Sequence, residues 1–164
     1  MSIRNIKPKA GQESVWDYPR PPRLEKFSGH IRISFNKQVI LDTNQAYRVL
    51  ETSHPPTYYL PISDFQTGVL QPTSRTSLCE YKGLANYWNL VVEGRVAPQA
   101  AWGYRYPNRD FAALKDTVSV YAHLVDACFV NDEKVQAQPG DFYGGWITSN
   151  IVGPFKGGPG TWGW

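Results

Sequence analysis

A short segment in the middle of the chain, SLCEYKG, places a thiol, a phenol and an amine within four residues. Nucleophilic catalysis requires a thiol or hydroxyl beside a base, and Cys79, Tyr81 and Lys82 supply such groups. In an extended strand, however, Cys79 and Tyr81 share one face while Glu80 and Lys82 share the other. Lys82 is therefore not automatically the group that activates Cys79. The alternative role of this cysteine is that of a small buried hydrophobic side chain.

A second candidate group lies at the end of the run VLETS, where Glu51 precedes a Pro-Pro break. A carboxylate at a strand end, followed by Thr, Ser and His54, can point into a cleft and exchange protons with Tyr81 or Lys82. The alternative role of Glu51 is that of a solvated acid or an ion-pair partner. Asp64, in the loop ISDFQTG, is expected to form an Asx-turn.

Large aromatic side chains recur on three expected strands. Tyr and Trp combine a flat apolar surface with a polar group, so Tyr59, Trp88 and Trp102 are candidate walls of a pocket. Alternation along a strand places Tyr87 and Trp88 on opposite faces, which means that these aromatics cannot all line one site. Most of them are expected to belong to the core.

The segment from Phe142 to Trp164 consists largely of Gly, Pro and aromatic residues, with a single lysine, Lys156. Its prolines and glycines disfavour regular helix or strand, and its aromatics are too many for a solvated linker. We expect an ordered, irregular strap that packs against a β core. Its backbone N–H groups, with Lys156 nearby, could bind an anion, and packing for stability alone is the alternative. The segment is not a Walker A motif, because that motif requires Ser or Thr after its lysine, whereas Gly157 follows Lys156.

Composition and spacing argue against several classes of function. No metal site or cofactor is predicted, because the His and Cys residues show none of the paired spacings of a structural metal site. The net charge of +3 is scattered, without the basic patch of a nucleic-acid-binding protein. No apolar stretch reaches the ~18 residues that span a bilayer, and residues 1–30 contain no apolar signal segment. We expect a cytoplasmic protein that binds neither nucleic acid nor membranes.

The elements that must position these residues are mainly β-strands. One domain over 13–164, preceded by a loose tail over 1–12, is the natural organisation of 164 residues. Short alternating runs predict an all-β layered fold, and the only convincing helix signal covers 108–115, so we expect at most two short helices. The expected strands are a hairpin over 30–42 and runs at 48–52, 57–61, 76–81, 84–94, 99–106, 118–122 and 127–130. A helical turn over 44–50 is the alternative to the strand at 48–52.

Four blocks stand in order along the chain: VLETSHPPTYYLPISDF, CEYKGLANYW, AAWGYRYP and GGWITSNIVGPFKGGPGTWGW. Together they resemble the family of unknown function numbered 427, over nearly the whole chain from Ser14. The resemblance implies a β-tent-like fold of two antiparallel sheets that lean together. Many β-tent proteins hold zinc with two CxxC pairs, which this sequence lacks. Others bind small ligands in an aromatic cage or act as thiol enzymes. The family also carries a nucleotidyltransferase-like label, but this sequence shows no paired-carboxylate metal site that would support that activity.

Carried onto this sequence, the family blocks point to a set of candidate positions: Glu51, Tyr59, Asp64, Cys79, Tyr81, Lys82, Trp102 and Lys156. The function we favour is a module that binds an unknown small molecule in an aromatic-walled cleft. Its expected ligand contacts are Glu51, Tyr59, Lys82, Trp88, Trp102 and Lys156. We expect four of the candidates, Glu51, Tyr59, Lys82 and Trp102, to converge on that cleft.

Two alternatives remain open. The first is an enzyme that uses the same cleft by acid–base or thiol chemistry, with Glu51, Tyr81, Lys82 and Cys79 as its catalytic candidates. The second is a scaffold or a homo-oligomer interface.

Overall fold

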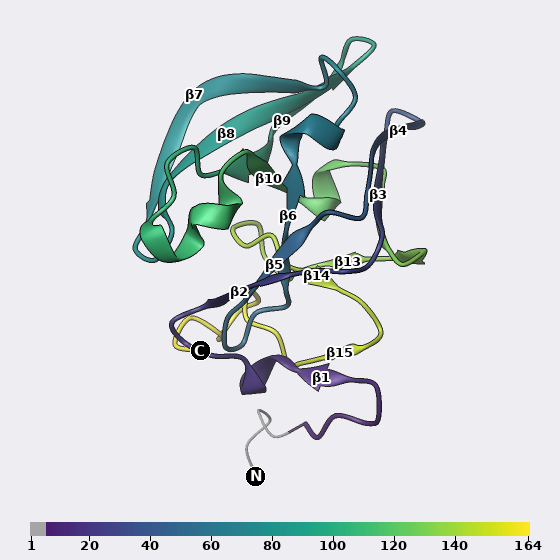
Figure 1. Cartoon of the computed structure of the whole chain (residues 1–164). Coiled ribbons are helices and arrows are strands. Elements are labelled where there is room, and N and C mark those ends of the chain that lie inside the picture. The colour runs from purple at the N-terminus through teal and green to yellow at the C-terminus, as the bar shows by residue number, and fades with distance from the viewer. Residues whose placement is uncertain (1–5) are drawn as a thin grey trace.

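The structure, a computed structural model, describes residues 6–164, so residues 1–5 of the expected tail lie outside it. Two larger antiparallel sheets dominate the described chain, and the expected mainly β fold is confirmed (Figure 1). The seven-stranded sheet has the order β2 (Arg23–Lys26), β5 (Tyr47–Leu50), β6 (Thr57–Pro61), β10 (Thr117–Val120), β9 (Arg95–Gly103), β8 (Gly83–Val92) and β7 (Leu70–Cys79). The four-stranded sheet has the order β12 (Glu133–Lys134), β11 (Ala127–Val130), β3 (Ile31–Phe35) and β4 (Gln38–Thr43).

Two small strand pairs and four 3-10 helices complete the described elements. The pairs are β13 (Gln136–Ala137) with β14 (Trp146–Ile147), and β1 (Glu13–Ser14) with β15 (Ile151–Val152). The helices are η1 (Val15–Asp17), η2 (Ile62–Asp64), η3 (Arg109–Leu114) and η4 (Ala122–Leu124). The expectation of at most two helices is therefore wrong. Each of these turns is too short to form an α-helix, and η3, which replaces the expected helix over 108–115, is interrupted by a non-helical Phe111.

Turn chemistry fixes the hairpins where the sequence indicates them. The hairpin of β3 and β4 turns at Asn36 and Lys37, both of which have positive φ angles, as a two-residue hairpin loop requires. A similar pair, Asn131 and Asp132, joins β11 to β12. Strand β7 begins six residues earlier than the expected run at 76–81. Pro72 is tolerated there because β7 is the edge strand of its sheet, where a missing N–H leaves no ladder bond unmade.

The main core lies between the two larger sheets. Apolar side chains at alternate positions of β3 face those of the seven-stranded sheet, including Leu60, Leu90 and Val118. Cys128 of β11 is buried among them, and burial raises the pKa of its thiol. Trp88 also belongs to this core, whereas Tyr87 lies on the opposite face of β8, as alternation predicts.

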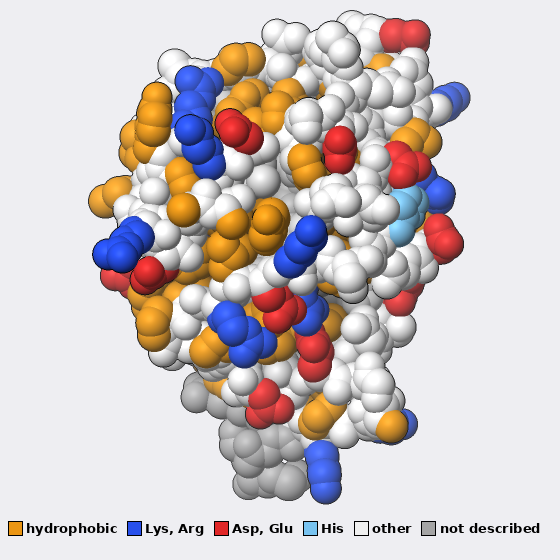
Figure 2. Space-filling model, in the orientation of Figure 1, with side chains coloured by type: hydrophobic (Ala, Val, Ile, Leu, Met, Phe, Trp, Pro, Cys, Tyr) orange, Lys and Arg blue, Asp and Glu red, His pale blue; other side chains and the backbone are white. Residues whose placement is uncertain are grey.

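The opposite face of the seven-stranded sheet carries a second apolar cluster. Its buried members are Val49, Tyr59, Ala85, Tyr87, Trp102, Tyr104, Phe111 and Leu114. Figure 2 shows hydrophobic side chains gathered in the centre and left of one face of the molecule, with charged side chains among them. The sheet is therefore apolar on both faces, and the four-stranded sheet covers only one of them.

The strap over 142–164 packs against both the core and the N-terminal segment. Trp146 is almost fully buried, stacks on Tyr58 with ring centroids 5.2 Å apart, and donates from Nε1 to the Val120 carbonyl over 3.0 Å. The strap's β15 runs parallel to β1 at the bottom of Figure 1, and Trp16 donates from Nε1 to the Pro154 carbonyl. Among residues 6–164, no helix has the length and apolar character needed to cross a membrane.

Replacing the buried strap residue Trp146 by Ala is expected to lower the free energy of unfolding by about 3–5 kcal/mol, because it leaves a cavity and an unpaired carbonyl. Trp162 is the matched control: it belongs to the same strap but is 77% exposed, and its replacement by Ala should change stability by less than about 0.5 kcal/mol. Urea unfolding of both variants measures the difference. Equal losses would show that Trp146 does not anchor the strap.

Candidate functional site

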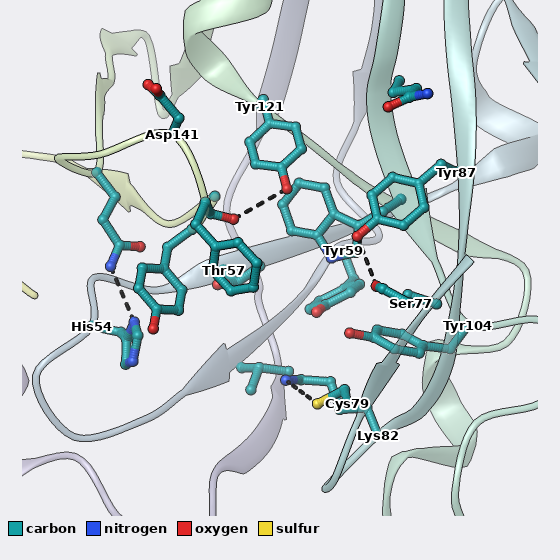
Figure 3. Close-up of a pocket in the computed structure, with 18 of the residues that line it drawn as sticks. His54, Thr57, Tyr59, Ser77, Cys79, Lys82, Tyr87, Tyr104, Tyr121 and Asp141 are labelled. Atoms are coloured by element: carbon teal, nitrogen blue, oxygen red, sulfur yellow. Dashed lines mark hydrogen bonds between the residues drawn. The ribbon is translucent and has the colours of Figure 1, made fainter. Parts of the chain in front are cut away.

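A cleft of about 460 Å³ opens on the second apolar cluster of the seven-stranded sheet. Figure 3 shows its aromatic side chains and the Lys82–Cys79 pair facing a common space. The sequence candidates that line it are Glu51, Tyr59, Cys79, Tyr81, Lys82, Trp102 and Lys156. Two candidates are elsewhere. Trp88 packs in the main core, and Asp64, in η2, accepts a hydrogen bond from Thr43 Oγ1 at 2.6 Å.

The expected wall residue Trp88 is thus replaced by side chains that the sequence did not single out as ligand contacts. Because β8 alternates, its cleft-facing aromatic is Tyr87, and the cleft-facing aromatics of the adjoining segments are Tyr104 and Tyr121. Tyr104 lies two positions after Trp102 and is on the same, cleft-facing side of the sheet, as alternation predicts, although β9 ends at Gly103. Continued alternation would place Tyr106 on the same face, but its side chain is 86% exposed because the chain has left the sheet.

The turn between β7 and β8 directs Lys82 toward Cys79. The carbonyl of Lys82 accepts from the backbone N–H of Asn108 at 2.8 Å, and Asn108 Nδ2 donates to the Tyr81 carbonyl. Gly83 adopts φ +113°, and a Cβ there would lie 3.3 Å from Asn108 Oδ1, so this position favours glycine. Because the strand ends at Cys79, strand alternation does not apply to Lys82, and its Nζ lies 3.7 Å from Cys79 Sγ.

Lys82 is a charged group in a largely apolar setting. Its Nζ lies 5.9 Å from the ring centroid of Phe111 and 6.0 Å from that of Tyr104. Burial by itself lowers the pKa of Lys82, but the neighbouring Tyr59, Cys79 and Glu51 together raise it above the ordinary lysine value. The amine is therefore protonated at neutral pH. Among the described residues, no carboxylate lies within 4 Å of it.

The imidazole of His54 is held in one tautomer by Gln138. The side-chain Oε1 of Gln138 accepts from the N–H of Gly145, so its Nε2 is a donor, and that atom donates to the Lys156 carbonyl and to His54 Nδ1. Nδ1 consequently carries no proton, and the proton of the neutral ring lies on Nε2. That nitrogen is 3.8 Å from Glu51 Oε2. Both ring nitrogens of His54 are thus oriented by neighbours.

One carboxylate oxygen of Glu51 has two close partners. Arg20 Nε lies 3.6 Å from Oε2, and His54 Nε2 lies 3.8 Å from the same oxygen. Burial, together with the positive charges of Lys156, Arg20 and Lys82, lowers the pKa of His54 to about 4, so the ring is neutral at pH 7. Arg20 and Gln138 lie 31 and 87 residues from Glu51, and no local motif in the sequence indicates either of them.

The strap supplies the remaining wall. Trp102 and Tyr121 pack with ring centroids 4.4 Å apart, and Tyr121 Oη donates to the Phe142 carbonyl at 3.2 Å. A Cβ at Gly144 would overlap the indole of Trp102, so the strap can lie this close only because that residue is a glycine. Lys156, the strap lysine, donates from Nζ to the backbone oxygen of Trp164 at 3.2 Å.

A family model described as "Domain of unknown function (DUF427)" matches residues 23–131, two thirds of the chain. The chain belongs to this family. No curated protein matches it.

The DUF427 region covers β2 to β11, and so contains Glu51, Tyr59, Cys79, Lys82 and Trp102. The strap residues of the cleft lie outside the matched range. Within residues 6–164 no group of three or more His, Cys, Asp and Glu side chains is arranged to hold a metal ion.

Acid is expected to destabilise this DUF427 protein through His54. The unfolded chain protonates this histidine near its ordinary pKa of 6.5, whereas the folded protein resists protonation until about pH 4. The stability that the neutral ring contributes is therefore complete above pH 6.5 and is lost as the pH falls toward 4. The replacement His54→Gln should remove about 3 kcal/mol of this pH dependence. Unfolding measured between pH 7 and 4, with the exposed His123→Gln as control, tests it; identical pH profiles for His54→Gln and wild type would contradict it.

The close approach of the strap to Trp102 gives another expected outcome. Gly144→Ala should lower the free energy of unfolding by about 1–3 kcal/mol, because the added methyl group displaces either the strap or the indole. Gly163 lies in the same segment, and a Cβ at that position would meet nothing within 4 Å, so Gly163→Ala should change stability little. Thermal unfolding of the two variants compares them, and a neutral Gly144→Ala would show that the strap does not rest on Trp102.

Proposed function

We propose that this protein binds a small organic molecule in the cleft. The observation that carries the proposal is the cleft itself: about 460 Å³, with large aromatic side chains on its walls and polar side chains among them. Ligand pockets in proteins are typically concave, mostly apolar and ~300–1,000 Å³ in volume, with few polar groups that set orientation.

The polar groups of the cleft support binding because they are held before any ligand arrives. Glu51 is oriented by Arg20 and His54, and Ser77 Oγ and Tyr87 Oη are hydrogen-bonded to each other at 2.8 Å. Preorganised side chains lose less conformational entropy when a ligand binds.

Thiol chemistry in the same cleft is the second candidate, and the contact of Lys82 Nζ with Cys79 Sγ favours it over the acid–base alternative. The acid–base alternative, Glu51 with Tyr81 or Lys82, has less support, because among the described residues Glu51 pairs with Arg20 and makes no hydrogen bond to either partner. A cytoplasmic location, in keeping with the two free thiols, and a homo-oligomer remain predictions, testable by fractionation and by light scattering.

A thermal-shift screen with a metabolite library tests the proposed binding. A ligand present at about 100 times its dissociation constant should stabilise the fold by ~2.7 kcal/mol. Lys82→Met and Glu51→Gln should each change the free energy of unfolding by no more than about 1 kcal/mol while abolishing the ligand-induced shift. Lys115→Met, at an exposed position outside the cleft, should keep the shift. Shifts that survive both cleft variants would place the ligand elsewhere.

A further inference from the structure

We infer that the ligand is an organic acid: its carboxylate is bound by Lys82, and its apolar body lies along the aromatic wall. This inference rests on the proposed binding function and adds the chemical class of the ligand. Three features of the cleft support it: the ammonium of Lys82, which has unused hydrogen-bond donors, the phenols beside this ammonium, and the apolar path that leads to the mouth.

The ammonium of Lys82 has hydrogen-bond donors that the described residues do not use. An ammonium has three N–H donors, and the described residues offer this one a single hydrogen-bond partner, the sulfur of Cys79. A partly buried charge without a counter-ion is unfavourable unless an opposite charge approaches it. The charge of Glu51 raises the pKa of Lys82, but its Oε2 lies near Arg20 and His54, and no carboxylate of the described residues lies within 4 Å of the ammonium. The remaining donors of Lys82 are therefore available to an anion that enters the cleft.

Two phenols stand beside this ammonium. Figure 3 shows the hydroxyl groups of Tyr59 and Tyr104 on the side of the cleft that holds Lys82 and Cys79. Burial raises the pKa of both phenols, so both keep their protons at neutral pH. Each already has a hydrogen-bonding neighbour, Cys79 for Tyr104 and Ser119 for Tyr59, and donates to an anion by exchanging that contact. One positive charge with two neutral donors matches a single carboxylate better than a doubly charged phosphate.

The other charged groups at the cleft have partners or lie at its rim. Lys156 donates to the Trp164 backbone oxygen, and Arg75 lies over the Tyr87 ring and donates to Gln99. Glu80 is exposed, Asp141 is exposed, and His54 is neutral. Lys82 is thus the cation of the cleft interior that has room for a bound anion.

The apolar path runs from Lys82 to solvent. Trp102 and Tyr121 form a continuous aromatic surface, and the mouth carries Leu78 and Phe142, which are 82% and 74% exposed. Large exposed apolar side chains at the entrance of a pocket are typical of surfaces that contact an apolar partner. A molecule with one carboxylate and an apolar body can pair its charge with the ammonium of Lys82 and pack its apolar part against this aromatic surface.

Cys79 provides a direct test, because its sulfur lies beside the inferred anion site. Iodoacetate and iodoacetamide have similar size but differ in charge. With either reagent the thiolate sulfur attacks carbon, a C–S bond forms, the C–I bond breaks, iodide leaves, and the thiol proton goes to solvent. The ratio of the two labelling rates at Cys79, measured by peptide mass spectrometry, reports anion preference, since changes in the reactivity of the thiol affect both reagents. Cys128 is buried and serves as the internal control.

Relative to the protein unfolded in urea, the folded protein should raise the ratio of iodoacetate to iodoacetamide labelling about tenfold, as expected for one charge-assisted contact. Lys82→Met should abolish this gain, Lys82→Arg should keep most of it, and Lys115→Met, at an exposed position outside the cleft, should leave it unchanged. An equal ratio in wild type and Lys82→Met would overturn the anion site while leaving small-molecule binding intact. Absence of labelling by either reagent in the folded protein would overturn both.

A second measurement needs no variant. In the wild-type protein, 2-naphthoate should protect Cys79 from iodoacetamide at least about tenfold better than 2-naphthamide, because only the acid carries the charge that Lys82 binds. Acetate, which has the charge without the aromatic body, should protect less than 2-naphthoate. Equal protection by acid and amide would overturn the carboxylate site, and equal protection by acetate and 2-naphthoate would overturn the apolar path.

Discussion

The seven-stranded sheet carries large side chains on both faces, and only one face can be covered by the four-stranded sheet. The second face must therefore be shielded by segments that are not strands of either sheet. Two segments contribute to this: the arm that contains η3, through Phe111 and Leu114, and the strap, whose Gly144 lies against Trp102. The cleft is what remains of that incompletely covered face, so its aromatic walls follow from the two-sided sheet.

The polar groups of the cleft are positioned by backbone turns rather than by strands. Lys82 reaches Cys79 because β7 ends there and Gly83 permits the turn, and the carbonyl that anchors this turn is bonded to Asn108. Glu51 and His54 follow the end of β5, where Gln138 fixes the imidazole. Strands thus supply the apolar surface, and strand ends and turns supply the chemistry.

Local patterns are enough to predict most of the fold. Alternation identifies the β3–β4 hairpin and separates Tyr87 from Trp88, and turn pairs such as Asn131–Asp132 mark strand ends. The site is only partly accessible from the sequence. Alternation predicts that Tyr87 and Trp88 lie on opposite faces of the sheet, but it does not predict which face carries the cleft. The sequence alone therefore could not exclude Trp88 from the predicted cleft. Arg20 and Gln138 act on Glu51 and His54 across long sequence separations, and no short-range pattern encodes such contacts.

The contact between the strap and the N-terminal segment has a consequence for the order of folding. Trp16 and Pro154 are 138 residues apart, whereas the long ladders of β7, β8 and β9 join neighbours in sequence. Closing so long a loop is entropically the most demanding step, so the hairpins are expected to form before it. The strap is then the last wall to close and the first to open by local fluctuation. Opening of the strap would widen the cleft beyond its mouth, on a timescale separate from the unfolding of the sheets.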